Sequence, residues 1–332
     1  EEPPMQYRAL GKRDDIQVST IALGCWPFAG GNVWGEQDDA QSVAAVHAAL
    51  DEGINFIDTA EGYGRSEEVL GRGLKGRRHQ AIVATKVSEA NLGADDVISA
   101  CERSLRKLQT DYIDLYQIHW PNRGVPLAET AGALDSLLSD GKIRAYGVCN
   151  FAEQDLSEMI ALSSCVTDQM PYNLAWRGIE RSVLPLCKAN GIGVICYSPL
   201  AQGILTGRYA NADEVPEGLA RSRHFADERP LSHHGERGLE EELFTAVAKI
   251  RGIAADLGEP MAAVALAWAR QQAGVTSLLV GARNADEVRR NIPSLELTLS
   301  EDVLQQLALA TEPIKEGLGD NLDMWYVPSR MR

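Results

Sequence analysis

Residues 95–119 read DDVISACERSLRKLQTDYIDLYQIH, and this stretch contains the repeating unit that decides the fold. Its first part, 95–108, has a helical pattern and begins with Asp95 and Asp96, whose charges suit the amino end of a helix. After a short turn, 113–119 is an apolar and aromatic run typical of a buried strand. This alternation predicts a parallel sheet, because parallel neighbours are joined through crossover helices.

The same alternation continues along most of the chain. We expect eight strands, at 21–23, 55–58, 81–85, 113–119, 145–149, 166–170, 193–197 and 277–280. The helices are expected at 38–52, 66–75, 95–108, 127–140, 153–162, 181–190, 241–256 with 261–272, and 284–291. Eight such units predict an α/β fold of the (β/α)8 (TIM) barrel type, whose usual size is about 250 residues.

Three segments exceed what a barrel of this kind needs. Strands at 7–10 and 16–19, joined through Asp14 and Asp15, are expected to form a hairpin that plugs the bottom of the barrel. A loop at 201–240 follows the seventh strand, and a structureless loop of that length is usually functional. The tail at 313–332 carries Trp325 and its apolar neighbours. We expect one domain, 1–332, with a core of about 7–312 and this tail.

The amino-acid composition limits which partners the protein can bind and which cellular compartment suits it. The 332 residues include 32 basic and 47 acidic side chains, for a formal charge of −15, which disfavours nucleic acid and anionic membranes as partners. No apolar run reaches the ~20 residues of a membrane span, and the start of the chain lacks the pattern of a signal peptide. The six cysteines form no Cys-x-x-Cys pair. We therefore expect a cytoplasmic globular protein with reduced thiols.

Polar side chains collect at the carboxyl ends of the predicted strands, where barrel enzymes carry their active sites. In strand order, these residues are Asp58 with Tyr63, Lys86, His119, Cys149 with Asn150, Gln169, Tyr197 with Ser198, and Gly281 with Arg283. Each alone also has a structural interpretation. Together they predict one polar site at a single rim of the barrel.

Four of these residues form a plausible proton-transfer group. A phenol has a pKa of ~10, and the ammonium of Lys86 is expected to lower the pKa of Tyr63 to about 7–8, which requires roughly 3–4 kcal/mol. Asp58 would keep Lys86 charged, and a neutral His119 would donate a hydrogen bond to a substrate carbonyl. Such a site is suited to protonating an alkoxide, as carbonyl reduction requires.

Four longer motifs make the chain resemble the aldo-keto reductases, in particular the bacterial general-stress and inositol-utilisation reductases. The motifs are GINFIDTAEGYG at 53–64, LRKLQTDYIDLYQIHWP at 105–121, GKIRAYGVCNF at 141–151 and YSPLAQGILTGR at 197–208, and the resemblance is collinear over about 7–300. It implies that Tyr63 is the general acid/base, that Lys86 and Asp58 tune it, and that His119 orients the carbonyl.

The resemblance also implies a cofactor, NADP(H) or NAD(H), bound in an extended pose without a Rossmann domain. Asn150 and Gln169 would hold its carboxamide, Tyr197 would stack on the nicotinamide, 198–203 would wrap the pyrophosphate and Arg208 would reach a phosphate. The full set of expected cofactor contacts is Gly24, Trp26, Asp58, Cys149, Asn150, Gln169, Tyr197, Ser198, Pro199, Leu200, Gln202, Gly203, Arg208, Gly281, Arg283, Glu287, Arg290 and Asn291.

The adenosine end of this cofactor site carries the choice between NADP(H) and NAD(H). Gly281 and Arg283 are expected to start a helix whose free N–H groups suit a 2′-phosphate, and Glu287 and Asn291 to face the adenine. Position 290 is arginine where relatives often carry an acid, and this favours NADP(H).

Two further departures from the family pattern concern other parts of the site. Cys149 replaces the usual serine before the carboxamide-binding asparagine, and the tail matches no family motif, so it would either fold over the pocket or contact a neighbouring subunit. The substrate is expected against Trp26, Tyr63, His119 and Trp120.

Two other sequence patterns bear on the function. The glycine pattern at 71–76 follows a helix rather than a strand, which argues against a dinucleotide-binding turn, and His224, His233 and His234 lack metal spacing, so no metal is expected. The leading hypothesis is an NADP(H)-dependent reductase of aldehydes or ketones. The alternatives are a cofactor-binding regulatory subunit resembling potassium-channel β subunits, and an aldolase-like barrel that uses Lys86 as a Schiff base. The sequence assigns no oligomeric state.

Overall fold

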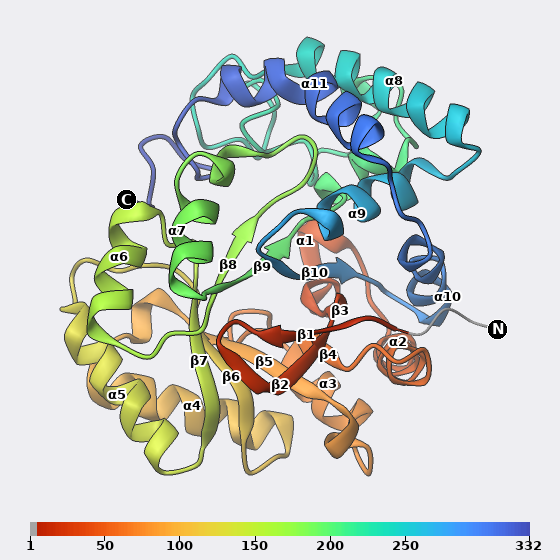
Figure 1. The fold of residues 1–332 in the computed structure, drawn as a ribbon. Helices are drawn as coiled ribbons and strands as arrows, with labels where there is room; N and C mark the ends of the chain where they lie inside the picture. Colours follow the sequence, from red (N-terminus) through yellow and green to blue (C-terminus); the bar gives the residue numbers. More distant parts are fainter. Residues whose placement is uncertain (1–4) are drawn as a thin grey trace.

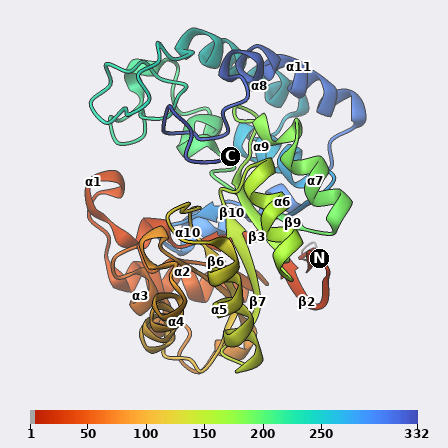
Figure 2. The ribbon, with the colours of Figure 1, turned by 90° about the vertical axis from the view of Figure 1, so that its left-hand side faces the viewer.

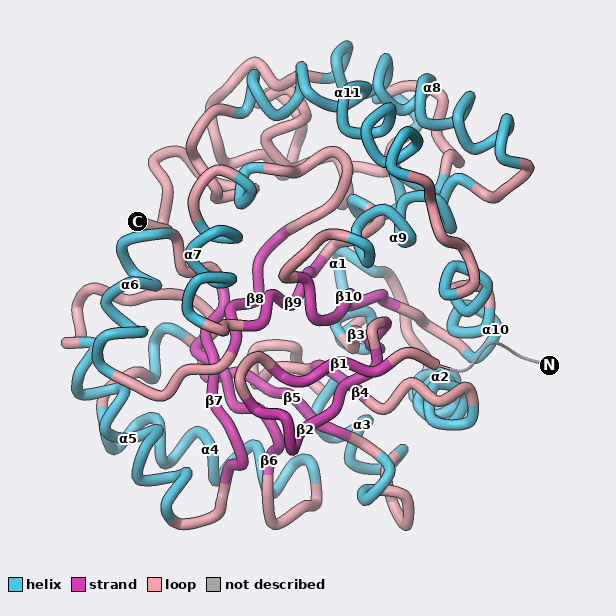
Figure 3. Tube along the Cα trace, viewed as in Figure 1, coloured by secondary structure: helices cyan, strands magenta, loops and turns pink. Residues whose placement is uncertain are grey.

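A closed barrel of eight parallel strands forms the centre of the protein (Figures 1 and 3). The computed structural model describes residues 5–332, so the expectation about the first four residues lies outside the described part. The barrel strands follow one another in chain order: β3 (Ile21–Gly24), β4 (Phe56–Asp58), β5 (Ile82–Val87), β6 (Ile113–Ile118), β7 (Ile143–Cys149), β8 (Thr167–Pro171), β9 (Gly193–Tyr197) and β10 (Val275–Gly281). β10 pairs with β3 and closes the ring, which confirms the predicted (β/α)8 barrel.

Helices surround this barrel, as Figure 1 shows. They are α1 (Gly31–Trp34), α2 (Asp39–Asp51), α3 (Ser66–Gly73), α4 (Ala94–Leu108), α5 (Leu127–Ser139), α6 (Glu153–Leu162), α7 (Val183–Asn190), α8 (Glu240–Leu257), α9 (Met261–Gln271), α10 (Ala285–Arg289) and α11 (Glu301–Leu318). Short 3-10 turns are η1 (Trp26–Ala29), η2 (Arg78–Gln80), η3 (Glu89–Asn91), η4 (Gly178–Glu180), η5 (Ala201–Thr206), η6 (Ala212–Glu214) and η7 (Ile292–Leu295). Gly71 and Gly73 lie in α3, so the glycine pattern there is helical, as expected.

The hairpin of β1 (Tyr7–Leu10) and β2 (Arg13–Ser19) closes the amino-terminal end of the barrel. Leu10, Ile16 and Val18 are buried against the inward-facing side chains of the barrel strands, including Phe56 and Leu115, which confirms the predicted plug. The predicted turn was wrong. Leu10 pairs with Arg13, so the turn is at residues 11 and 12, while the two aspartates lie within β2.

The carboxyl-terminal region differs from the prediction in its boundaries. α11, which the sequence analysis missed, begins at the Ser300 cap and continues through Pro313 to Leu318, so it occupies the start of the predicted tail. Its apolar side, with Leu307 and Ile314, is buried, and the helix packs against α8. The irregular tail therefore begins at Gly319, where the helix ends. α10 is shorter than the predicted 284–291.

The long loop between β9 and α8 and the tail form one connected substructure (Figure 2). The Arg223 N–H donates to the Met324 carbonyl at 2.9 Å, and the Arg223 guanidinium donates to backbone carbonyls of residues 318 and 321. His233 forms a bridge with Tyr326 and stacks on its ring at 5.6 Å. Both segments join the barrel at its carboxyl end, so they cover the rim that carries the predicted site.

Three further properties of the described residues concern membranes, thiols and metals. Among residues 5–332, no helix combines the length and the apolar composition needed to cross a membrane. All six cysteines are buried free thiols. In the same range, no group of three or more histidine, cysteine or acidic side chains is arranged to hold a metal ion.

Candidate active site

Asp58, Tyr63, Lys86 and His119 meet at the carboxyl end of the barrel. Asp58 ends β4, Lys86 lies near the end of β5, and His119 directly follows β6. The Asp58 carboxylate accepts a hydrogen bond from the Lys86 ammonium, which also donates to the Thr59 carbonyl at 2.8 Å. The Lys86 Nζ lies 5.0 Å from the centroid of the Tyr63 ring. The centroids of the Tyr63 and His119 rings are 5.6 Å apart.

Local hydrogen bonds hold Tyr63 in the loop between β4 and α3. Its N–H donates to the Ala60 carbonyl and its carbonyl accepts from the Ser66 N–H, both at 3.0 Å. The Ser66 hydroxyl in turn donates to the Cys25 carbonyl at 2.9 Å, which ties the start of α3 to the end of β3. The tyrosine is therefore carried by a compact turn rather than by a free loop.

The Asp58–Lys86 pair is a buried ion pair, with both side chains at 3% exposure or less. Burial lowers the pKa of Lys86, but the acidic groups around it, the Asp58 carboxylate first among them, together more than offset this effect and raise the pKa above its usual value. Lys86 is consequently a permanent cation close to the Tyr63 ring.

The pKa of Tyr63 differs from the expectation. Burial raises it to about 12, and the opposing effect of Lys86 is smaller, so the predicted lowering to about 7–8 is wrong for this arrangement. The difference arises because burial removes water from the phenolate, a cost that the residue types alone do not indicate. The phenol is thus fully protonated at neutral pH and has an O–H to donate.

His119 is a neutral imidazole at neutral pH, as expected. Burial lowers its pKa to about 3, and the cations of Lys86 and Arg330 act in the same direction. A neutral ring carries one N–H and one acceptor nitrogen, so it can donate a hydrogen bond to a carbonyl oxygen without adding a charge.

Gln117 is a site residue that the sequence analysis missed. Its side-chain nitrogen donates to Asp58 Oδ2 at 3.2 Å, and the nitrogen of Gln169 donates to the same oxygen at 3.0 Å. The Cys149 thiol donates to Gln117 Oε1 at 3.6 Å. The available signal was strand periodicity, since residues 117 and 119 lie on the same face of a strand.

Asn150 and Tyr197 are joined at the ends of β7 and β9. The Tyr197 hydroxyl donates to Asn150 Oδ1 at 2.8 Å, and Asn150 Nδ2 donates to the His119 carbonyl at 2.9 Å. Asn150 has φ 63°, a left-handed conformation that asparagine tolerates better than most residues. Its amide is therefore fixed beside the histidine backbone.

The backbone after β9 is strained in a way typical of ligand sites. Ser198, Ala201 and Gln202 all have positive φ although none is glycine, and Gly203 follows at φ 95°. The Gln202 side-chain nitrogen is buried and has no partner among the described residues. Pro199 and Leu200 lie within this turn, and the Leu200 carbonyl accepts the Gly203 N–H at 2.9 Å. A polar ligand at this turn would satisfy the unpaired amide, so the predicted 198–203 segment fits a phosphate-bearing cofactor.

The predicted adenosine end is partly different from the expectation. Asn284 Oδ1 accepts the Glu287 N–H at 2.9 Å and Glu287 Oε2 accepts the Arg283 N–H at 2.8 Å. Two of the N–H groups at this end of the site, those of Arg283 and Glu287, are thus bonded within the chain, and the expected contact between free N–H groups and a 2′-phosphate stays a prediction. Arg283 instead donates to Gln37 Oε1 at 2.8 Å, and Arg290 is exposed. The positive charge at this end of the site is therefore carried by the side chains of Arg283 and Arg290.

The remaining predicted contacts take up three positions on the same rim. Gly24 and Gly281 are register partners at the ends of β3 and β10. Arg208 is exposed on the long loop, where its Nε donates to Thr206 Oγ1 at 3.2 Å. Asn291 donates to the Glu287 carbonyl at 2.9 Å.

Aromatic side chains of the rim surround Tyr63. The Trp26 ring stacks on Tyr63 at 6.0 Å and 25°, so one expected substrate contact adjoins the phenol. The second expected tryptophan contact is Trp120, whose ring centroid lies 3.6 Å from Cζ of the Arg330 guanidinium. Arg330 in turn makes two hydrogen bonds to the Asp323 carboxylate. Of the two placements considered for the tail, the structure shows it folded over this rim. The tail residues, including Trp325, were not assigned to the site from sequence because no motif marks them.

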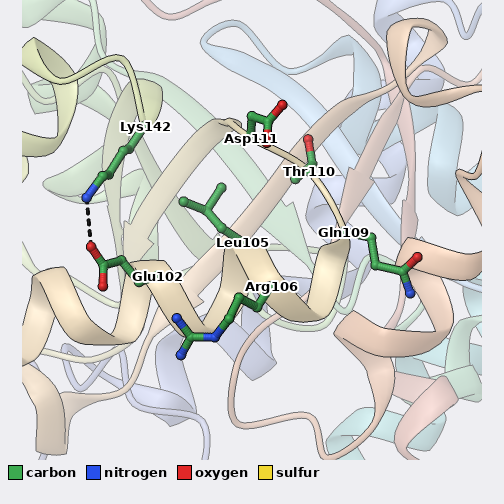
Figure 4. Close-up of a pocket in the computed structure, with 7 residues that line it drawn as sticks. All are labelled: Glu102, Leu105, Arg106, Gln109, Thr110, Asp111 and Lys142. Carbon is green, nitrogen blue, oxygen red and sulfur yellow. Dashed lines mark hydrogen bonds and ion pairs between the residues drawn. The ribbon is translucent and has the colours of Figure 1, made fainter.

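A separate hollow of about 460 Å³ lies away from this site, and Figure 4 shows the residues that line it. It is lined by Glu102, Leu105, Arg106, Gln109, Thr110, Asp111 and Lys142. Residues 109–111 precede β6 and Lys142 precedes β7, so the hollow lies at the amino ends of the strands, opposite the end that carries Tyr63 and Lys86. Lys142 and Glu102, two of its lining residues, form an ion pair at 2.8 Å.

Comparison with known proteins gives the class. The profile of the aldo/keto reductase family matches residues 20–311. The chain therefore belongs to the aldo/keto reductase family.

Individual relatives differ in what their names describe. The aldo-keto reductase YhdN of Bacillus subtilis (strain 168) is 36% identical over 86% of this chain and 87% of its own length. The NADH-specific methylglyoxal reductase of Escherichia coli (strain K12) is 33% identical over 90% and 97%. A probable voltage-gated potassium channel subunit beta of Arabidopsis thaliana is 29% identical over 88% and 92%.

Solved structures of the family agree with the fold. The aldo-keto reductase AKR11C1 from Bacillus halodurans superposes with a TM-score of 0.77 at 28% identity, covering 92% of this chain and 96% of its own. An aldo/keto reductase from Klebsiella pneumoniae in complex with NADP and acetate gives a TM-score of 0.73 at 31% identity, covering 94% and 96%.

Proposed function

We propose that this protein is an NADP(H)-dependent oxidoreductase that reduces aldehydes or ketones to alcohols, reversibly. One observation carries the proposal: the Tyr63 ring lies 5.0 Å from the ammonium nitrogen of the buried Lys86 and 5.6 Å from the His119 ring. This arrangement has a proton donor, a group that stabilises the anion left behind, and a hydrogen-bond donor for a carbonyl oxygen. Bound NADPH would supply the hydride that reduces the carbonyl carbon.

The residues of the chain have distinct roles in this proposal. His119 donates a hydrogen bond to the carbonyl oxygen and orients it toward Tyr63. Tyr63 Oη then gives its proton to that oxygen, and the Lys86 ammonium stabilises the resulting phenolate. Asp58 holds the ammonium in place with help from Gln117 and Gln169, which donate to its second oxygen.

The strained turn after β9 is the part of the rim that suits the cofactor's diphosphate, with Gln202 as the unpaired amide and Arg208 as a nearby cation. Asn150, Gln169 and Tyr197 would hold the nicotinamide end. We favour NADP(H) over NAD(H) because Arg283 and Arg290 place positive charge at the adenosine end. Relatives do not decide this point, since one is named NADH-specific and another was crystallised with NADP.

We further place the protein near the bacterial general-stress and inositol-utilisation reductases within the family. The proposal treats residues 1–332 as one catalytic domain that acts on a small carbonyl compound, with no nucleic-acid partner. Six buried free thiols favour a reducing compartment such as the cytoplasm.

The substitution Tyr63→Phe tests the proposed proton donor. It removes the phenolic O–H and keeps the ring that stacks on Trp26. We expect kcat for aldehyde reduction with NADPH to fall by at least about a hundredfold, the usual contribution of a general acid. The affinity for NADPH, measured by fluorescence titration, should change little. Full turnover by a variant that still binds NADPH would exclude Tyr63 as the donor.

A regulatory subunit is the second candidate, because a relative named as a potassium channel subunit beta matches most of the chain. Such a role predicts slow release of cofactor, very low turnover on a panel of carbonyl compounds, and a partner protein that co-purifies. Rapid multiple turnover with free exchange of NADPH would argue against it. An aldolase-like use of Lys86 requires a lysine that loses its proton, and the raised pKa of Lys86 opposes this.

A further inference from the structure

Glu61 is a mostly buried acid in the turn that carries Tyr63. It lies two residues before the tyrosine, and its side chain is 12% exposed. Its Oε1 accepts two hydrogen bonds from the segment after β5, one from the Ser88 N–H at 2.7 Å and one from Asn91 Nδ2 at 2.9 Å. One carboxylate oxygen therefore joins the turn between β4 and α3 to the segment that follows Lys86.

The backbone makes a shorter link between the same two segments. The Glu61 N–H donates to the Lys86 carbonyl at 3.2 Å, and the Lys86 ammonium donates to the Thr59 carbonyl at 2.8 Å. These bonds end at Lys86. The Glu61 side chain extends the link by two residues, to Ser88, which directly follows the last residue of β5.

The end of β5 is also bonded to the third member of the proposed catalytic group. The Val87 carbonyl accepts the His119 N–H at 2.9 Å. The segment from Lys86 to Ser88 is thus tied to the Tyr63 turn on one side and to His119 on the other. Its position contributes to the 5.0 Å between Lys86 Nζ and the Tyr63 ring and to the 5.6 Å between the Tyr63 and His119 rings.

The charge of Glu61 matters less to this link than its acceptor oxygen does. The charged partner is Arg103, whose Nη2 lies 3.5 Å from Glu61 Oε2 and whose side chain is 44% exposed. Exposed ion pairs of this kind stabilise proteins little, whereas an N–H group that loses its acceptor inside a folded chain is costly. An amide oxygen at position 61 would accept the same two hydrogen bonds.

We infer that Glu61 is a positioning residue for the proposed carbonyl reduction, and that its Oε1 holds the Tyr63 turn against the end of β5. The phenol thereby stays beside the Lys86 ammonium and within reach of the carbonyl oxygen that His119 orients. This inference rests on the proposed reductase activity and adds to it a residue that acts only through its neighbours. A displacement of about 1 Å in a catalytic group can lower a rate by about a hundredfold, so the link acts on the chemical step.

Single-turnover kinetics test the role of the acceptor oxygen. The protein is loaded with NADPH and mixed with benzaldehyde, and the loss of NADPH absorbance gives the rate of hydride transfer. We expect Glu61→Ala to lower this rate by at least about tenfold, because the phenol loses its fixed place beside Lys86. The KM for benzaldehyde and the affinity for NADPH should stay within about twofold of wild type. Glu61→Gln keeps the oxygen and removes the charge, and its rate should stay within about threefold of wild type.

Three further variants separate the acceptor from its surroundings. Glu68→Ala removes an exposed acid of α3, and Arg103→Met removes the ion pair, and both should behave as wild type. Asn91→Ala removes one of the two donors and should lower the rate. It keeps the test available if Glu61→Ala does not fold. The double variant Glu61→Ala/Asn91→Ala should be no slower than Glu61→Ala, because both changes act through one oxygen.

Two kinetic results would overturn the inference. An unchanged rate in Glu61→Ala would show that the link does not position the phenol. Equal losses in Glu61→Ala and Glu61→Gln would assign the effect to the charge rather than to the hydrogen bonds.

Amide hydrogen exchange separates a failure of this inference from a failure of the proposed reductase activity. The Ser88 and Tyr63 amides should exchange faster in Glu61→Ala than in wild type or Glu61→Gln, because the link that protects them is lost. If the wild type reduces no aldehyde, the reductase activity fails, and this difference in exchange still supports the positioning role. Equal exchange in the three proteins overturns that role, whether or not the wild type is active. Faster exchange with an unchanged single-turnover rate also overturns it, while the reductase activity stands.

Discussion

At the scale of single residues, the site depends on which charges are buried with partners. Lys86 is completely buried and remains a cation because Asp58 contacts its ammonium group. His119 has no such partner: burial lowers its pKa, the nearby cations act in the same direction, and the ring stays neutral. Lys86 and His119, which both lie near Tyr63, therefore differ in charge because Lys86 has a buried carboxylate partner and His119 has none.

The lowered pKa of His119 leads to a pH-dependent stability. The unfolded chain binds a proton at the usual histidine pKa of about 6.5, whereas the folded protein does so only near pH 3. Between these values the unfolded state binds more protons, so this residue makes the free energy of unfolding fall as the pH decreases from 6.5 toward 3.

The variant His119→Gln removes that contribution. Urea unfolding at pH 7.0 and pH 4.5 should show a smaller loss of stability on acidification for His119→Gln than for wild type, because the variant has no proton to take up there. His224, whose pKa burial lowers to about 4, contributes equally to both proteins. The exposed His79→Gln variant serves as the control and should follow wild type. Equal acid losses in wild type and His119→Gln would contradict this linkage.

The polar residues at the strand ends could be predicted from the sequence, but the pKa values that result from their burial could not. Asp58, Lys86 and His119 were found because each follows an apolar run in the linear order. The desolvation that raises the pKa of Tyr63 depends on Trp26 and on segments far away in sequence, so it was visible only in three dimensions. Gln117 was overlooked because it lies inside a strand rather than at its end.

At the scale of elements, the turn of the β1–β2 hairpin requires glycine. Gly11 has φ +59°, and a Cβ there would lie 2.0 Å from the Val166 carbonyl oxygen, which accepts the Gly193 N–H at the start of β9. The hairpin thus fits against the amino ends of β8 and β9 with no space for a side chain. The turn was predicted at the two aspartates because aspartate is common in turns, and this close approach explains why residue 11 is used instead.

The substitution Gly11→Ala should lower the free energy of unfolding by about 2–3 kcal/mol, combining left-handed strain with the clash. Gly76→Ala is the matched control. Gly76 has φ +78° but open space around its Cα, so the expected loss is only about 1 kcal/mol. Both losses are measured by urea unfolding. Equal losses for the two variants would show that the hairpin moves freely away from the barrel.

α11 shows a second limit of sequence patterns. Its Ser300 cap and acidic first turn are ordinary start signals, yet Pro313 inside the helix suggests an end. Packing of its apolar side against α8 stabilises the helix past the proline, and such tertiary contacts are not encoded in a local pattern.

At the scale of the whole molecule, alternation of strands and helices was sufficient to predict the barrel. The arrangement of the 201–240 loop and the tail over the rim could not be predicted, because both segments have little periodicity. Only the structure shows that they join through Arg223 and together present Arg221 and Trp325 next to Trp26. Loop pairings of this kind depend on individual contacts and leave no repeating signal.

An extended dinucleotide would span this rim from the nicotinamide end at β7 and β9 to Arg283 after β10. Several tryptophans stand along or near the route, including Trp26 and Trp34, whose rings are 5.4 Å apart. Binding should therefore change tryptophan emission.

The most direct test is a fluorescence titration of the purified protein with NADPH and, separately, with NADH. The account predicts saturable quenching by both nucleotides and tighter binding of NADPH, with the difference reduced by Arg283→Ala. Absence of quenching and of binding with either nucleotide would contradict the central claim, because the proposed carbonyl reduction has no other source of hydride.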